Sequence, residues 1–190
     1  MPVTPFTAAA ILTPNLLAVG MLGVGTPSLA QGVGIGLSTW TPKVAVESID
    51  VGTLGAGKGV PIPVLIPPPV ILTNLTIGFT AQGILGLLAP AFIAGLSNGL
   101  VQLYATALTN TTHVGVGVGS GVARFVPPPA FNDIKAGLEA VGANGDGAVK
   151  FSKALAQALE STFRTLILPQ PIVGPPNIVP GVGKGFGTIF

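Results

Sequence analysis

The residues whose types and spacing come closest to a chemical site form a glycine-rich segment that ends in a lysine, Gly52-Thr53-Leu54-Gly55-Ala56-Gly57-Lys58. These seven positions match the start of a phosphate-binding loop, in which backbone N–H groups and the lysine hold the phosphates of a nucleotide. The eighth position would need a Ser or Thr hydroxyl for magnesium and should open a helix. It is Gly59, and the following Val60-Pro61-Ile62-Pro63 cannot begin a helix. We therefore interpret the segment as a glycine turn.

The other polar candidates do not combine into a catalytic or metal site. His113 is the only histidine and has no acidic or nucleophilic neighbour in sequence, while Glu47 and Asp50 would lie on opposite faces of a strand. Asn144-Gly145-Asp146-Gly147 resembles the start of a calcium loop but lacks its twelve-residue ligand pattern, so a turn and a helix N-cap explain it better. The chain has no cysteine. We expect no catalytic, cofactor-binding or metal-binding residue, and hence no enzyme.

The glycine-rich segment belongs to an internal repeat that organises the whole chain. Similar blocks stand at 55–60, 117–122 and 181–186. Further upstream, an ungapped alignment of the helical regions places Leu12 with Phe79 and Leu138, and Leu29 with Leu96 and Leu155. Proline runs at 67–69 and 127–129 mark the joins. We predict three fused copies of one small unit, residues 1–66, 67–126 and 127–190, packed as a single body.

Hydrophobic periodicity predicts a pair of helices in each repeat. In the third repeat it indicates helices over 131–141 and from 146 to about 168, and Asp146 and Lys150 are spaced to form an ion pair on the second of them. Transfer of this pattern predicts helices near 74–85 and 90–109, and near 7–19 and 28–39. Gly32, Gly99 and Ala158 share one column of the alignment, where a small residue would let two helices cross at short distance.

After each helix pair the chain becomes extended. Residues 44–50 partly alternate apolar and polar side chains, as half-buried strands do, and residues 112–118 alternate more strictly. The third repeat has five prolines between 169 and 180 instead, which favours a polyproline-like arm. Residues 59–69 and 169–181 are candidate arms that would embrace neighbouring subunits. The predicted fold class is thus α+β, with three pseudo-repeats that each carry a helix pair followed by a Gly/Pro-rich extended or β segment.

Composition indicates that much of the surface is covered by partners. Only eight basic and six acidic residues occur among 190, none of them between Lys58 and Arg124, and the net charge is +2. Apolar surface of that extent marks contacts with other proteins or with a membrane, and the scattered basic residues do not predict nucleic-acid binding. A membrane protein is the alternative, with 84–108 as the best spanning segment, although Pro90, Asn98 and Gln102 interrupt it.

The N-terminal region raises the possibility of a cleaved leader. Residues 6–25 are apolar and Ser28-Leu29-Ala30 resembles a signal-peptidase site, but no Lys or Arg precedes Lys43. Because the segment aligns with the interiors of the other two repeats, we interpret it as part of the folded structure.

The third repeat also carries a resemblance. Leu155-Ala156-Gln157-Ala158-Leu159 in an apolar helix, then Ile172-Val173-Gly174-Pro175-Pro176 and a Pro-Gly-x-Gly-x-Gly ending, looks like small virion structural proteins of tailed bacteriophages. It extends over all three repeats and carries over no functional residue. The resemblance implies a component of a phage head, neck or tail, located in the virion, whose partners are copies of itself and other assembly subunits.

Overall fold

The computed structural model describes the backbone of residues 4–40, 44–51, 56–61, 68–106, 108–114, 119–126, 130–163, 170–174 and 182–189. Side chains are described for residues 4–38, 69–103, 105 and 130–160.

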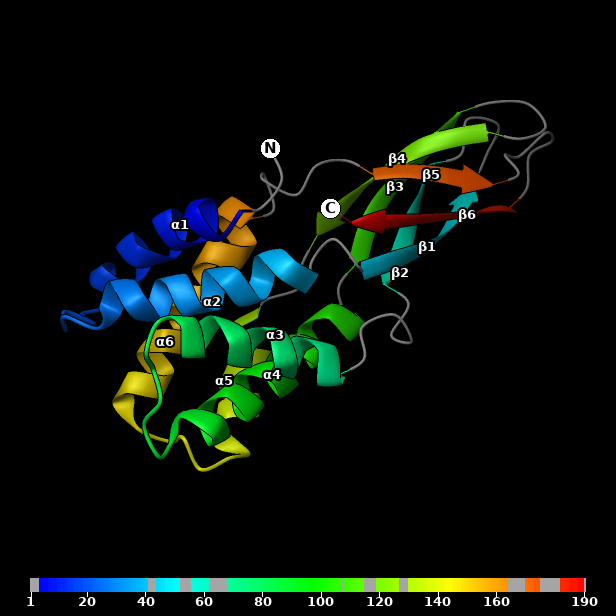
Figure 1. The fold of residues 1–190 in the computed structure, drawn as a ribbon. Helices are drawn as coiled ribbons and strands as arrows, with labels where there is room; N and C mark the ends of the chain where they lie inside the picture. Colours follow the sequence, from blue (N-terminus) through cyan, green and yellow to red (C-terminus); the bar gives the residue numbers. More distant parts are fainter. Residues whose placement is uncertain are drawn as a thin grey trace.

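Six α-helices form the part of the molecule that we call the helical body (Figure 1). They are α1 (Pro5–Ala18), α2 (Thr26–Trp40), α3 (Pro68–Ala81), α4 (Ala89–Thr106), α5 (Ala130–Glu139) and α6 (Asp146–Gln157), and α6 continues as the π-helical turn η3 (Ala158–Phe163). Each helix packs against the next one in the chain, and α6 packs against α1. The helices therefore close into a ring, and each third of the ring is one helix pair of the repeat.

The helices occur where the periodicity predicts them. The largest difference is at α3, which begins at Pro68 rather than near residue 74. Prolines are tolerated in the first turn of a helix because the N–H that they lack has no partner there in any case. Beyond Phe163, residues 164–169 of the last predicted helix lie outside the described residues.

Apolar residues at four-residue steps build the core. This spacing places side chains on one face of a helix, one turn apart. The first helix of each pair contributes three such residues, all at most 1% exposed: Ala8, Leu12 and Leu16 from α1, Ile71, Leu75 and Phe79 from α3, and Ala130, Ile134 and Leu138 from α5. The second helices add Val33 and Leu37, Leu96 and Leu100, and Leu155 and Leu159. Each Leu, Ile or Phe side chain buried in this way stabilises the fold by about 1.5–3 kcal/mol.

The helix ends show that the sequence alignment of the first repeat is wrong by four residues. Each first helix stops at a glycine with positive φ, 83° at Gly20, 69° at Gly83 and 83° at Gly142. The residue after that glycine donates its backbone N–H to the carbonyl oxygen of Leu16, Phe79 or Leu138, in each case at 3.0 Å. Leu16, and not Leu12, is therefore the counterpart of Phe79. A shift of four residues is about one helical turn and keeps the apolar face on the same side, so periodicity could not detect it.

Glycines lie at the joints between repeats, that is, where the second helix of one repeat crosses the first helix of the next. Where α2 crosses α3, a Cβ on Gly78 would collide with the carbonyl oxygen of Gly32, and where α4 crosses α5, a Cβ on Gly137 would collide with that of Gly95. On Gly99 a Cβ would lie 2.8 Å from the carbonyl oxygen of Asp133. The predicted close crossing of helices at Gly32 and Gly99 is confirmed. In the corrected alignment, however, Gly36 and not Gly32 shares the column of Gly99 and Ala158.

Six strands lie to one side of the helical body, two from each repeat (Figure 1). All neighbours in the closed sheet are antiparallel, in the order β1-β2-β3-β4-β5-β6 with β6 paired back to β1. Because β5 pairs with β4 and β6, the polyproline-like arm predicted for the third repeat is wrong for its residues 170–174. The strand bounds are β1 (Val44–Val51), β2 (Ala56–Pro61), β3 (Leu108–Val114), β4 (Gly119–Val126), β5 (Gln170–Gly174) and β6 (Val182–Ile189).

The predicted α+β fold class is wrong for the packed part of the molecule. The part of the chain that the structure describes with its side chains is all-helical, with six helices and neither strand nor sheet. An α+β fold would bury the apolar faces of its helices against a sheet. Here the helices bury those faces against one another, because glycine at the crossings allows close approach, and every core residue of the described part comes from the helices.

Candidate functional site: an apolar surface at the turns of the helical body

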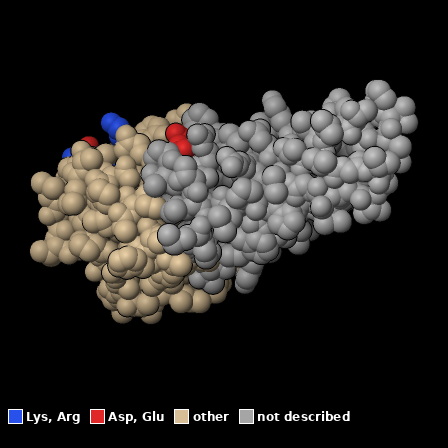
Figure 2. All heavy atoms as spheres, turned by 90° about the horizontal axis from the view of Figure 1, so that it is seen from above, with Lys and Arg blue, Asp and Glu red and all other residues tan. Residues whose placement is uncertain are grey.

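Charged residues are distributed very unevenly among the described helices. Helices α1 to α4 carry no Asp, Glu, Lys or Arg at all. On the third helix pair, Lys135 pairs with Glu139 at 2.5 Å and Lys150 with Asp146 at 2.6 Å, which confirms the second pair as predicted. Figure 2 shows the result, a broad uncharged face with a few charged side chains near one edge. The charged residues of the described part are Asp133, Lys135, Glu139, Asp146, Lys150, Lys153 and Glu160.

The turns between paired helices project large apolar side chains into solvent. In the α1–α2 turn Leu22 is 77% and Val24 103% exposed, and in the α3–α4 turn Leu85, Leu87 and Leu88 are 70%, 96% and 78% exposed. We call these five residues the apolar tip. Both turns lie at the end of the helical body away from the strands (Figure 1).

The first two turns are equivalent in structure, and the third differs in chemistry. After their positive-φ glycines, Leu22 corresponds to Leu85 and Val24 to Leu87, because the corrected alignment places Gly20 on Gly83. In the third turn the same positions hold Asn144 and Asp146. The backbone geometry of the turn therefore does not require apolar residues here, and their presence in two of the three repeats needs another explanation.

A hollow of about 350 Å³ opens beside the apolar tip. Phe92 lies at the centre of its aromatic wall, with ring centroids 6.0 Å from Phe79 and 5.1 Å from Phe151, the latter edge to face. Met21, Ile84 and Leu88 from the turns complete the lining, so all three repeats contribute. None of the described residues that line this hollow is charged, and its chemistry suits an apolar group.

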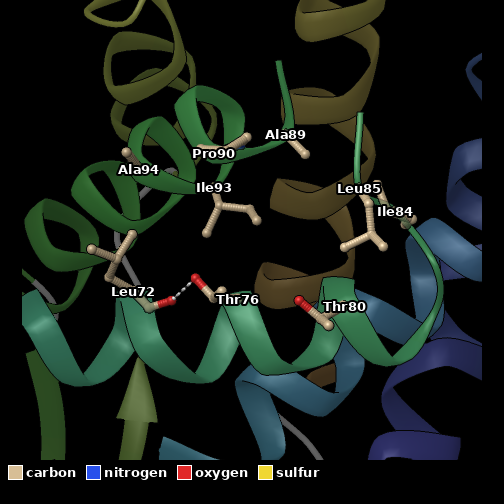
Figure 3. A pocket seen from close by; sticks show the side chains of 9 residues that line it. All are labelled: Leu72, Thr76, Thr80, Ile84, Leu85, Ala89, Pro90, Ile93 and Ala94. Atoms are coloured by element: carbon tan, nitrogen blue, oxygen red, sulfur yellow. Dashed lines mark hydrogen bonds between the residues drawn. The ribbon is translucent and has the colours of Figure 1, made fainter. Parts of the chain in front are cut away.

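A groove of about 330 Å³ continues from the hollow along the outer side of α3 and α4 (Figure 3). The two share Ile84 and Ala89. The Thr76 hydroxyl, which faces the groove, donates a hydrogen bond of 2.7 Å to the carbonyl oxygen of Leu72, so its donor is used within its own helix. The groove, like the hollow, suits contact with apolar groups.

No titratable side chain of the described part lines the hollow or the groove. Among them no three His, Cys, Asp or Glu side chains gather closely enough to hold a metal ion. Burial raises the pKa of the Asp133 carboxyl above its ordinary value of 3.8, but this group lines neither the hollow nor the groove. Glu160 accepts a hydrogen bond from the backbone N–H of Ala130 and so caps the start of α5.

Most of the candidate site residues considered in the sequence lie in the strands. Lys58 is in β2, His113 in β3, and Glu47 and Asp50 in β1, and the side chains of all four are outside the described part, as are residues 52–55. Residues 144–147 form a turn and the start of α6, as predicted, and the N-cap residue is Gly145, which makes no side-chain capping hydrogen bond. The missed feature is the apolar tip. Its signal was available, because turns are normally polar and Leu22, Val24, Leu85 and Leu87 are not.

Within the described residues no helix has the length and apolar content needed to cross a bilayer. The best spanning candidate from the sequence, 84–108, contains the turn before α4 and α4 itself.

Comparison with known proteins identifies no relative: no family model, no curated protein and no solved structure matches the chain.

Proposed function

We propose that this protein is a structural subunit of a large assembly, in which neighbouring copies and other subunits cover its apolar surface. The apolar tip is the observation that carries the proposal. Monomeric soluble proteins rarely expose contiguous apolar patches of more than a few hundred Å², and larger patches mark interaction sites. The absence of any charge on α1 to α4 adds to this, since obligate interfaces are depleted in charged residues at their core.

The assembly that we propose is the virion of a tailed bacteriophage. The resemblance of the third repeat to virion structural proteins supports this choice. Mass spectrometry of purified particles from a phage that encodes the chain tests the assignment. We expect peptides of the chain at a fixed ratio to the major capsid or tail protein. Their absence from intact particles would remove the virion from the proposal.

Sedimentation velocity of the purified chain without detergent tests the broader proposal. We expect defined oligomers whose proportion rises with protein concentration, because burial of the apolar tip drives association. A compact monomer at all concentrations would contradict the proposal. A chain that needs detergent to stay in solution and floats with lipid vesicles would instead favour the membrane-contacting alternative.

A further inference from the structure

We infer that the apolar tip is a self-association surface through which two copies of the chain meet about a two-fold axis, with exposed side chains of each tip entering the hollow of the other. The inference rests on the proposed function and names the contact by which the subunit joins its own copies.

The tip carries both halves of such a contact side by side. Val24 and Leu87 are 103% and 96% exposed, and Leu87 stands between Gly86 and Leu88, which both line the hollow of about 350 Å³. Leu88 belongs both to the projecting side chains and to the hollow, because it lines the hollow and is itself 78% exposed. In a two-fold contact the same patch occurs on both sides, so it must present a projection and a matching recess together. This surface does.

The five exposed side chains supply part of the apolar area that a stable dimer buries. At about 25 cal/mol per Å² and 1.5–3 kcal/mol per side chain, each large apolar residue brings roughly 60–120 Å². The five residues of the apolar tip then supply roughly 300–600 Å², against about 800 Å² per partner in a standard interface. The glycine backbone of the turns and the walls of the hollow lie next to them and would contribute to the remainder.

Charge favours a second copy over a lipid surface as the occupant. The apolar tip holds no Lys or Arg, whereas segments that lie on membranes carry basic residues around their apolar face. The nearest turn of the third repeat brings Asp146, whose charge is paired with Lys150 at 2.6 Å. The two turns that form the apolar tip carry no charge. Two tips would therefore approach each other without repulsion between unpaired like charges from these turns.

A pair of charge substitutions tests the contact. Val24→Glu together with Leu87→Glu places two carboxylates on each tip, at positions so exposed that folding does not depend on them. Phe6→Glu is the matched control, because Phe6 is 80% exposed but lies at the other end of α1, about 20 Å away. We expect the double variant to weaken association at least about 100-fold in sedimentation velocity, and the control to associate like the original chain. Unchanged circular dichroism and melting temperature verify that both variants fold.

Cross-linking tests which surfaces meet. The chain contains no cysteine, so Leu87→Cys and Met21→Cys each introduce a single thiol, one on a projection and one at the hollow. When the two variants are mixed, a short bis-maleimide should join one to the other and yield a mixed covalent dimer. A mixture of Leu87→Cys with Phe6→Cys should yield none.

The outcomes separate this inference from the proposed function. Association of the original chain that the double variant leaves intact, or a mixed dimer through Phe6→Cys in place of Met21→Cys, overturns the tip-to-tip contact and leaves an assembly subunit that uses another surface. A monomeric original chain overturns both. Binding of the original chain to neutral phosphatidylcholine vesicles, lost in the double variant while no oligomer forms, assigns the tip to lipid and also contradicts both.

Discussion

At the scale of single residues, glycine decides how closely the repeats approach each other. Gly78 and Gly137 stand at equivalent places on α3 and α5, and each faces the backbone of the preceding helix without room for a Cβ. The third joint, between α6 and α1, is built differently. At the place that corresponds to Gly78, α1 has Asn15, whose amide donates a hydrogen bond of 2.8 Å to the carbonyl oxygen of Ile11. The ring is thus held by two glycine joints and one joint of another kind.

We predict that Gly137→Ala lowers the free energy of unfolding by about 1–3 kcal/mol, because the added methyl group would collide with the carbonyl oxygen of Gly95 and the backbone of Gly99. Gly147→Ala is the control. A Cβ there meets no atom within 4 Å in the first turn of α6, and the exchange should raise that free energy by up to about 1 kcal/mol. Urea unfolding of both variants provides the measurement. Equal effects of the two would contradict the close crossing.

At the scale of elements, α6 shows how one helix separates the core from solvent. Phe151, Leu155 and Leu159 are at most 2% exposed, while Lys150 and Lys153 lie on the other side. We predict that Leu155→Asp lowers the free energy of unfolding by more than about 4 kcal/mol and prevents folding, because it buries a charge without a partner. Lys153→Ala should change it by less than about 0.5 kcal/mol. Circular dichroism distinguishes these outcomes, and a folded Leu155→Asp chain would show that this face of α6 is not in the core.

The elements also show which parts of the fold could be predicted. Apolar spacing located the two helices of the third repeat, because a helix in a small body must bury one face, and transfer of that pattern through the repeat located the other four described helices. The same spacing could not reveal the four-residue error in the alignment of the first repeat, because Leu12 and Leu16 lie on one face of α1 and are both buried. Packing partners are not encoded in periodicity. Whether the helices would lie on a sheet or on one another depended on the glycine crossings, and α+β was the wrong choice for the helical body. The apolar tip was visible in the residues of the turns but was not recognised.

At the scale of the whole molecule, the contrast between the uncharged first four helices and the charged last two sets how association should respond to salt. Contacts between charged surfaces weaken as the Debye length falls to about 3 Å at 1 M salt, whereas apolar contacts do not depend on it. We predict that NaCl between about 0.05 and 1 M leaves the oligomer distribution nearly unchanged, and that ammonium sulfate shifts it toward larger species. Sedimentation velocity across both salts tests this. Dissociation by NaCl would show that ion pairs hold the copies together.

Closure of the ring by α6 against α1 has a consequence for synthesis on the ribosome. Ala8 and Leu12 emerge first, yet the helix that completes their surroundings begins only at Asp146. At roughly 5–20 residues per second, the nascent chain waits on the order of ten seconds before its first helix meets its last. A stop codon anywhere ahead of α6 would therefore leave the apolar face of α1 exposed for the lifetime of the fragment. Such truncated products should be cleared by proteases or aggregate rather than accumulate in a folded form.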